Sequence, residues 1–210
     1  MNDFNFKLVM IGDVNIGKSS ILSTKMNKKL SLVHCPTIGI DFVSFIDQYN
    51  LYNIKFNIWD TSGNNNFDNI INTYYSDVYG AIAVFNIGKK NTFDNLDSRI
   101  EQFRKIGKAF NLLIVGNIIG DKREVSPEEI AKKTKTYGAR YIEVDCRNYD
   151  TINSLFMITA EMMIIDHKKR MQKTGNIQEM NTLLPVKKQG NYYVRLDNIK
   201  PKCFSRCVIL

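Results

Sequence analysis

Phosphate chemistry is indicated near the start of the chain, where a glycine-framed loop and Lys18-Ser19 follow the apolar run 8–11. In such a strand-loop-helix unit, backbone N–H groups face nucleotide phosphates, the lysine contacts the terminal phosphates and the serine hydroxyl holds Mg²⁺. The positive end of the helix dipole adds to the attraction for anions. An ordinary glycine-rich turn with a solvated lysine is the alternative. The candidate binding residues are Gly12, Asp13, Val14, Asn15, Ile16, Gly17, Lys18, Ser19 and Ser20.

A second polar group follows the apolar run 52–59, which ends in Asp60 and is followed by Gly63. An acid at a strand tip beside a phosphate loop can hold Mg²⁺ through water, and a glycine N–H there can meet the γ-phosphate. The Thr37 hydroxyl, which lies between the two groups in sequence, would complete the metal shell when a third phosphate is bound. Ser19, Thr37 and Asp60 are therefore the candidate metal ligands.

Apolar runs bounded by turn residues alternate with helical patterns along the first 170 residues. The predicted strands are 5–11, 42–49, 52–59, 79–87, 111–117 and 140–144, with a hairpin between the second and the third. The predicted helices are 18–28, 69–76, 91–107, 127–137 and 151–170. This alternation predicts an α/β fold whose mostly parallel sheet is covered on both faces and binds ligands at the carboxyl ends of its strands.

The motifs together resemble the Rab-type small GTPases of the Ras superfamily over residues 6 to about 165. The matching stretches include Thr-Ile-Gly-Ile-Asp-Phe at 37–42, Ile-Trp-Asp-Thr-Ser-Gly at 58–63 and Asp-Lys-Arg-Glu-Val-Ser at 121–126. The resemblance implies a P-loop small-GTPase fold with a six-stranded, mostly parallel sheet and one antiparallel edge hairpin. It also implies a Mg²⁺-dependent GTP/GDP switch in vesicle trafficking, in which Lys18 and Thr37 take part in catalysis and loops 30–41 and 60–76 respond to the nucleotide.

Partners follow from the same resemblance: a guanine nucleotide, effector proteins, exchange factors and the prenylation machinery. Phe42, Trp59 and Tyr74 match the aromatic trio that Rab proteins present to effectors. The alternative is that these three are ordinary hairpin and core aromatics.

Two departures from the family concern hydrolysis. Asn64 stands where relatives carry the glutamine that orients the attacking water, and asparagine is one methylene shorter. Val14 stands at a position that is glycine in Ras and usually small in Rabs, where a branched side chain crowds the water. Tolerated drift would explain either change alone, whereas both together predict slow hydrolysis.

Two further departures concern the base. Where the family has Asn-Lys-x-Asp, this chain has Asn117, then Ile118, with Gly120 in the aspartate column and Asp121 one place late. The family's Ser-Ala-Lys after the sixth strand is replaced by Asp145, Cys146 and Arg147. Arg147 could cover the base, while Asp145 could accept hydrogen bonds or be a solvated loop acid. We expect guanine to be the preferred base, but with weaker contacts to the base than to the phosphates.

The tail differs in charge from the rest of the chain. Residues 1–165 carry 19 basic and 18 acidic side chains, whereas residues 166–210 carry 10 and 3, so the net charge of +8 belongs mostly to the tail. This distribution gives little reason to expect nucleic-acid binding and suits an anionic membrane surface as well as a solvated linker. We expect a domain at 1–170 and a basic flexible tail at 171–210.

The chain ends in Cys207-Val-Ile-Leu, which fits a prenylation box, and the final leucine favours geranylgeranyl. Cys203 could carry a second lipid or be a free thiol. No secretory signal, paired metal-binding cysteines or disulfide framework is indicated, which favours a reducing, cytosolic setting. We therefore expect a lipid-anchored protein on the cytoplasmic face of an intracellular membrane, cycling with the cytosol.

Two other function classes fit parts of the sequence. A membrane-tethered pseudo-GTPase would act as an interaction module that binds nucleotide constitutively or hardly at all. A P-loop ATPase or small-molecule kinase would share the phosphate loop, but the sequence has no arginine-rich lid or second substrate motif.

Overall fold

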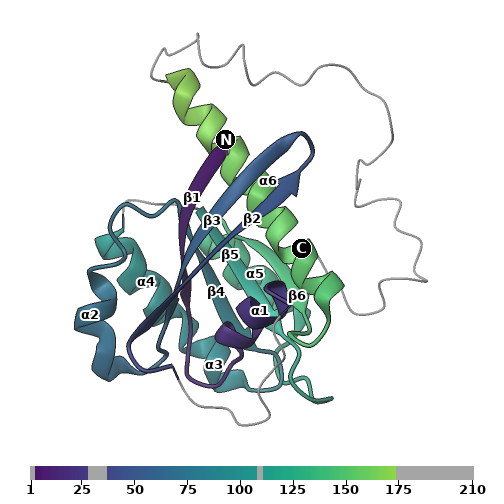
Figure 1. Ribbon diagram of the computed structural model, residues 1–210. Helices are drawn as coiled ribbons and strands as arrows, with labels where there is room; N and C mark the ends of the chain where they lie inside the picture. Colours follow the sequence, from purple (N-terminus) through teal and green to yellow (C-terminus); the bar gives the residue numbers. More distant parts are fainter. Residues whose placement is uncertain (1–2, 28–36, 108–110, 174–210) are drawn as a thin grey trace.

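Six strands form one sheet in the order β2-β3-β1-β4-β5-β6 (Figure 1). The computed structural model describes residues 3–27, 37–107 and 111–173. The strands are β1 (Phe4–Ile11), β2 (Ile40–Tyr49), β3 (Tyr52–Thr61), β4 (Gly80–Asn86), β5 (Asn111–Asn117) and β6 (Arg140–Val144). All neighbours run parallel except β2, which pairs antiparallel with β3 from Ile40 opposite Thr61 to Tyr49 opposite Tyr52. The predicted mostly parallel sheet with an antiparallel edge hairpin is confirmed.

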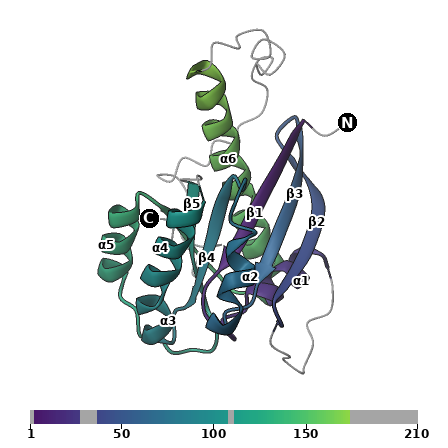
Figure 2. The same ribbon diagram turned by 90° about the vertical axis from the view of Figure 1, so that its left-hand side faces the viewer.

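Helices cover both faces of the sheet (Figure 2). They are α1 (Lys18–Lys25), α2 (Asp68–Asn72), α3 (Lys90–Asp94), α4 (Leu96–Ile106), α5 (Pro127–Tyr137) and α6 (Tyr149–Lys173), with a 3₁₀ turn, η1, at Asn65–Phe67. One apolar core joins α1 and α6 to the sheet through residues such as Leu22 and Phe156. The other core joins the helices α2, α3, α4 and α5 to the opposite face of the sheet, through residues such as Ile71, Ile100 and Ile130.

Local chemistry explains where several helices begin and end. At the start of α5, the Ser126 hydroxyl accepts from the Glu129 N–H while the Glu129 carboxylate accepts from the Ser126 N–H, a reciprocal cap that fixes the first turn. The Asn148 side chain accepts from the Asp150 N–H, and α6 accordingly begins at Tyr149, two residues before the predicted start.

Three predicted helices differ from the structure in extent. The helix expected at 18–28 ends at Lys25, and residue 28 lies outside the described residues. The helix expected at 69–76 is the 3₁₀ turn followed by the short α2, which ends at Asn72. The helix expected at 91–107 is interrupted at Asn95, whose carbonyl accepts a hydrogen bond from the Ser98 hydroxyl. Asn95 itself keeps helical dihedrals, φ −64° and ψ −18°, so α3 and α4 are separated by this one residue, and apolar spacing alone does not reveal so short an interruption.

The parallel topology brings the carboxyl ends of β1, β3, β4, β5 and β6 to one edge of the sheet. The glycine-framed loop follows β1, the Asp60–Gly63 segment ends and follows β3, and Asn117 ends β5. Residues that are far apart in sequence therefore meet where an open parallel sheet binds its ligands.

Candidate functional site

The loop between β1 and α1 depends on two glycines. Gly12 and Gly17 adopt φ values of +136° and +88°, which side chains rarely allow. A Cβ on Gly12 would lie 2.2 Å from the Val84 carbonyl oxygen, and one on Gly17 would lie 2.3 Å from Asn117 Nδ2. Both glycines are thus required by close approach of the loop to neighbouring strands.

Lys18 lies across this loop. Its Nζ donates to the carbonyl oxygens of Gly12, at 2.9 Å, and Asp13, at 2.7 Å. The residue is buried, and burial lowers the pKa of its ammonium to about 8, partly offset by the charge of Asp60. Among the described residues, the Lys18 ammonium donates to carbonyl oxygens alone, and a buried cation in such a setting would be stabilised by an anion such as a phosphate.

The three predicted metal ligands lie together. Ser19 Oγ lies 2.9 Å from Thr37 Oγ1 and donates to Asp60 Oδ2 at 2.5 Å. Asp60 is buried, and burial raises the pKa of its carboxyl, against the opposing effects of the Ser19 hydrogen bond and the Lys18 charge. Its Oδ1 is buried without a hydrogen-bond partner among the described residues. Two hydroxyls beside a carboxylate with an unused oxygen suit Mg²⁺, which prefers hard oxygen ligands and keeps several waters. Ser19, Thr37 and Asp60 would hold this ion, and when bound it would neutralise the negative charge of the phosphates.

Gly63 approaches the phosphate loop very closely. A Cβ there would lie 2.1 Å from the Asp13 carbonyl carbon and 2.2 Å from the Val14 nitrogen. The sequence predicts that the Gly63 N–H meets the γ-phosphate, and the structure places this backbone directly against the loop that would hold the phosphates.

The Asn64 side chain caps the 3₁₀ turn that follows it. Its Oδ1 accepts from the Asn66 N–H at 3.0 Å and caps η1, while its own N–H donates to Ser62 Oγ at 3.2 Å. The residue is exposed and shares an open pocket of about 520 Å³ with Val14 and Gly63. The two residues predicted to slow hydrolysis thus line one cavity, and the Asn64 amide oxygen is already occupied by a turn.

Asn117 organises the predicted base site. It is fully buried, its Nδ2 donates to the Ile16 carbonyl at 2.8 Å and its Oδ1 accepts from the Cys146 N–H at 3.2 Å. One side chain therefore links the phosphate loop, β5 and the segment after β6. The neighbouring Ile118 packs against the apolar core on the α2 to α5 face, and its N–H donates to the Val144 carbonyl.

The acids near the base site are arranged differently from the family pattern. Arg147 donates two parallel hydrogen bonds to the Asp145 carboxylate, from Nε to Oδ1 at 2.9 Å and from Nη2 to Oδ2 at 2.8 Å. This bidentate pair is the main reason why the pKa of Arg147 is raised, with a smaller contribution from the charge of Asp121. Asp121 is exposed and follows Gly120, whose φ is +78°. Arg147 thus lies within electrostatic reach of both Asp145 and Asp121, and it pairs directly with Asp145.

The three predicted effector-facing aromatics form a continuous row. The ring centroids of Phe42 and Trp59 lie 4.7 Å apart, and those of Trp59 and Tyr74 lie 4.6 Å apart. Phe42, at the end of the row, is 47% exposed. The row crosses from β2 to β3 and on to the segment after α2.

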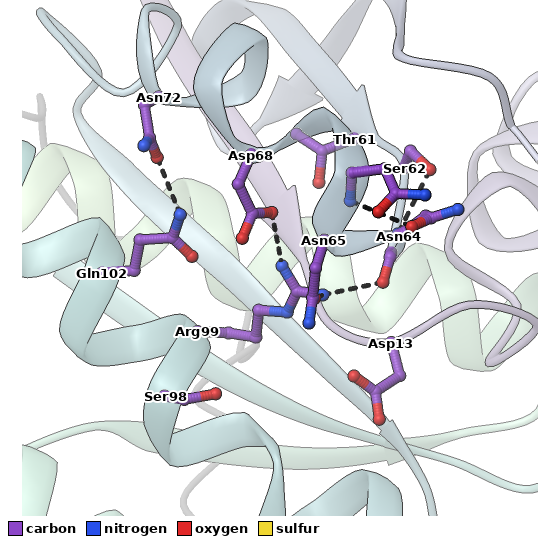
Figure 3. Close-up of polar contacts among 12 residues, drawn as sticks. Asp13, Thr61, Ser62, Asn64, Asn65, Asp68, Asn72, Ser98, Arg99 and Gln102 are labelled. Carbon is purple, nitrogen blue, oxygen red and sulfur yellow. Dashed lines mark hydrogen bonds and ion pairs between the residues drawn. The ribbon is translucent and has the colours of Figure 1, made fainter.

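Arg99 is a site residue that the sequence reasoning missed. It extends from α4 to Gly63, Asn65 and Asp68 (Figure 3). The signal was present, because Arg99 lies on the apolar stripe formed by Leu96, Ile100 and Phe103 at helical spacing, where a charge needs a partner. Nearby, Asn95 Nδ2 donates to Asp13 Oδ2 at 2.8 Å and ties the same helix region to the phosphate loop.

The predicted lipidation residues Cys203 and Cys207 lie outside the described residues, as does the basic tail. Within the described part of the chain, no helix is long and apolar enough to cross a bilayer.

The comparisons with known proteins agree with this geometry. The family model described as "Ras family" matches residues 7–165. Two proteins described as "Ras-related protein Rab-8A", from Pongo abelii and Bos taurus, are each 29% identical over 211 residues, covering 99% of this chain and 98% of theirs. The matched region contains the phosphate loop, the hydroxyl and carboxylate cluster and the base site described above. The chain belongs to the Ras family and is a small GTPase of the Rab type.

Proposed function

We propose that this protein is a Mg²⁺-dependent GTP/GDP switch anchored to cytoplasmic membranes in vesicle trafficking, with slow intrinsic hydrolysis. The observation that carries nucleotide and metal binding is the cluster of Ser19, Thr37 and Asp60 beside Lys18, which offers two hydroxyls, an unpartnered carboxylate oxygen and a buried cation. The Rab-8A relatives match almost the whole chain, which supports a role in trafficking.

Slow hydrolysis is supported by Asn64 and Val14. The Asn64 oxygen must leave the Asn66 N–H before it can orient a water, and its side chain is one methylene shorter than glutamine. Val14 is 37% exposed on the wall of the same pocket, where its branch occupies space near the expected γ-phosphate. A displacement of about 1 Å costs on the order of a hundredfold in rate.

Single-turnover GTP hydrolysis tests this part of the proposal. Asn64→Gln and Val14→Ala should each be faster than the wild type, and their combination faster still, by about ten- to hundredfold. Asn66→Gln is the matched control, since it adds the same methylene two residues along the same loop and should leave the rate unchanged. A wild-type rate equal to that of Asn64→Gln would contradict the assigned cause.

Nucleotide identity requires a separate measurement, because the family's base-reading acid is replaced by Gly120. The nucleotide content of the purified protein, followed by calorimetry with GTP, GDP and ATP in Mg²⁺, should show guanine nucleotide with micromolar or tighter binding. Absence of bound nucleotide and of measurable binding would instead identify a membrane-tethered interaction module.

Membrane attachment rests on Cys207 and the basic residues of the tail. Incubation with geranylgeranyl diphosphate and prenylation enzymes should add one geranylgeranyl mass to the wild type and none to Cys207→Ser. A second added mass that disappears in Cys203→Ser would show double lipidation. An unmodified wild type would refute the anchor.

A further inference from the structure

The turn between β2 and β3 presents a large apolar side chain to solvent. Leu51 is 72% exposed, and the chain reverses its direction between Tyr49 and Tyr52, where Asn50 adopts a φ of +53°. Such turns usually carry glycine or polar residues, which tolerate these backbone angles and hydrogen-bond locally. A single exposed leucine is ordinary in a folded protein, so its surroundings decide whether it has a role.

Leu51 is continuous with an apolar groove that lies between this turn and α6. The groove has a volume of about 310 Å³, and its lining includes Tyr49, Leu51, Tyr52, Ile164, Ile165 and Lys168. Figures 1 and 2 both show the turn and the C-terminal part of α6 at the same end of the molecule. Tyrosine, with an apolar ring and a polar hydroxyl, suits a boundary between hydrocarbon and water. The exposed leucine is therefore part of a patch and not an isolated side chain.

The charge of α6 beside this groove is positive. Glu161 and Asp166, the acids on this part of the helix, are each paired with an arginine. Lys168 and Lys169 follow them, and the Lys168 Nζ lies 5.3 Å from the centroid of the Tyr52 ring. A lysine can lay its aliphatic stem along an apolar surface while its ammonium reaches an anionic group at the rim. An apolar patch with lysines at its edge is therefore complementary to a surface that is apolar inside and anionic outside.

The rest of the chain leaves the domain at this end. Helix α6 ends at Lys173, and residues 174–210 carry six basic and two acidic side chains before and within the box that begins at Cys207. The segment proposed to carry the lipid is thus joined to the domain at the end where the groove lies. Both would meet the same bilayer.

The nucleotide site lies at the other end of the sheet. Strand β3 begins at Tyr52, beside the turn, and ends at Thr61, next to Asp60. Its ten residues span roughly 30 Å at a rise of about 3.3 Å per residue. A bilayer in contact with the turn would therefore leave the phosphate loop and the row of Phe42, Trp59 and Tyr74 accessible from solution.

We propose that the β2–β3 turn and the groove beside α6 form a docking surface for an anionic lipid bilayer, with Leu51 among the lipids and Lys168 and Lys169 on headgroup phosphates. The proposal rests on the proposed membrane attachment and adds to it a defined face of the folded domain. A bilayer fits this surface better than a second copy of the chain, because a two-fold contact would bring the same lysines of both copies together.

Vesicle sedimentation of the full-length, unprenylated chain tests the proposal. On vesicles of phosphatidylcholine mixed with phosphatidylserine, Leu51→Asn should lower the partition coefficient by about fivefold to tenfold, because the transfer of one leucine side chain into lipid is lost. The double variant Lys168→Gln, Lys169→Gln should lower it by about tenfold on these vesicles and change little on phosphatidylcholine alone, because the attraction is to anionic headgroups.

Two matched controls carry the same substitutions elsewhere on the surface. Ile70→Asn removes an apolar side chain that is 54% exposed on α2, and the double variant Lys132→Gln, Lys135→Gln removes two charges from α5. Each should change the partition coefficient by less than about twofold, since neither helix lines the groove. Circular dichroism checks that each variant is folded.

A fluorescence measurement reports whether the turn itself enters the lipid. The chain contains one tryptophan, Trp59, so subtraction of the wild-type spectrum isolates the emission of a second one in Leu51→Trp. On the mixed vesicles this emission should shift to shorter wavelength and be quenched by lipids brominated on their acyl chains. Ile70→Trp, which places the reporter on α2, should show neither the shift nor the quenching.

Several results would overturn the inference: no binding of the wild type to the mixed vesicles, equal partition of wild type and Leu51→Asn, an equal loss in Ile70→Asn, or no quenching in Leu51→Trp. A dimer in sedimentation velocity that Leu51→Asn dissociates would assign the groove to a second copy of the chain instead. Because these measurements use the unprenylated chain, they judge the docking surface even if Cys207 is never lipidated, so this proposal and the lipid anchor fail separately.

Discussion

The buried side chain of Asn117 joins three segments of the site, so Asn117→Ala should weaken both the fold and the nucleotide site. The substitution leaves the Ile16 carbonyl and the Cys146 N–H without this partner. A buried polar group left unsatisfied costs about 1–3 kcal/mol. The bond to the Ile16 carbonyl is buried, so its loss is assigned the whole range of about 1–3 kcal/mol. The bond from the Cys146 N–H is partly buried, so its loss is assigned about 1 kcal/mol.

The sum is about 2–4 kcal/mol in the free energy of unfolding, a large share of the 5–15 kcal/mol typical of a domain. For a domain of this size, each kcal/mol lowers the melting temperature by about 2–4 °C, which gives a decrease of about 4–16 °C. Because Ile16 belongs to the phosphate loop, dissociation of a fluorescent GDP analogue should also accelerate by about tenfold, or 1.4 kcal/mol.

The assay combines thermal unfolding by circular dichroism, at one fixed nucleotide concentration, with stopped-flow release of the analogue. Asn111→Ala is the control, since Asn111 begins the same strand and also makes two side-chain bonds, to the Tyr79 carbonyl and to Asp166. It is half-buried and far from the site, so it should lower stability modestly and leave the release rate unchanged. Equal effects of the two substitutions on release, or no effect of Asn117→Ala on either quantity, would refute the reasoning.

Three further predictions follow from the site geometry. Gly63→Ala should reduce affinity for a GTP analogue by about tenfold or more, while GDP affinity changes less, because the added Cβ would lie 2.1 Å from the Asp13 carbonyl carbon. Calorimetry with both nucleotides checks this prediction, and equal losses of affinity for the two would contradict it. Gly120→Asp should raise the ratio of GTP affinity to ATP affinity by about tenfold, since a carboxylate hydrogen bond to the base is worth about 1.5–3 kcal/mol. The position has room for a side chain, and Asp tolerates its positive φ. An unchanged affinity ratio would show that another residue reads the base. Burial raises the pKa of the Cys146 thiol, so alkylation of this cysteine should be slow at neutral pH and should accelerate as the pH rises. Peptide mass spectrometry follows the alkylation, and fast labelling at neutral pH would show that the base site is open.

Most of the fold could be predicted from the sequence because the strands carry continuous apolar runs and the helices carry apolar residues at helical spacing. The strand positions and the doubly covered sheet are confirmed. Helix ends were less predictable. The interruption at Asn95 and the end of α2 at Asn72 fall inside the predicted helices, and a repeating apolar pattern does not locate helix ends closely.

The candidate phosphate and metal residues could also be predicted, because the loop glycines, Lys18 and Ser19 are adjacent in sequence and their chemistry is local. Thr37 and Asp60 were predicted from a hydroxyl between the two polar groups and an acid at a strand tip, and the structure brings their side chains to Ser19. The pairing of Asp145 with Arg147 could not be read from the sequence, since adjacent charges can equally face solvent.

The sequence by itself determined the family, the order of strands and helices and the phosphate loop, because these depend on local spacing and apolar periodicity. Only the tertiary structure decided how Asn64 and Arg99 are used. Asn64 caps a turn because η1 begins next to it, and Arg99 binds the Gly63–Asp68 segment because α4 packs beside that segment. The Arg99 role arises from contacts between segments that are far apart in sequence, whereas the Asn64 cap is a bond to the N–H two residues further along the same turn. The free energy of a buried charge is set by the partners that folding brings to it.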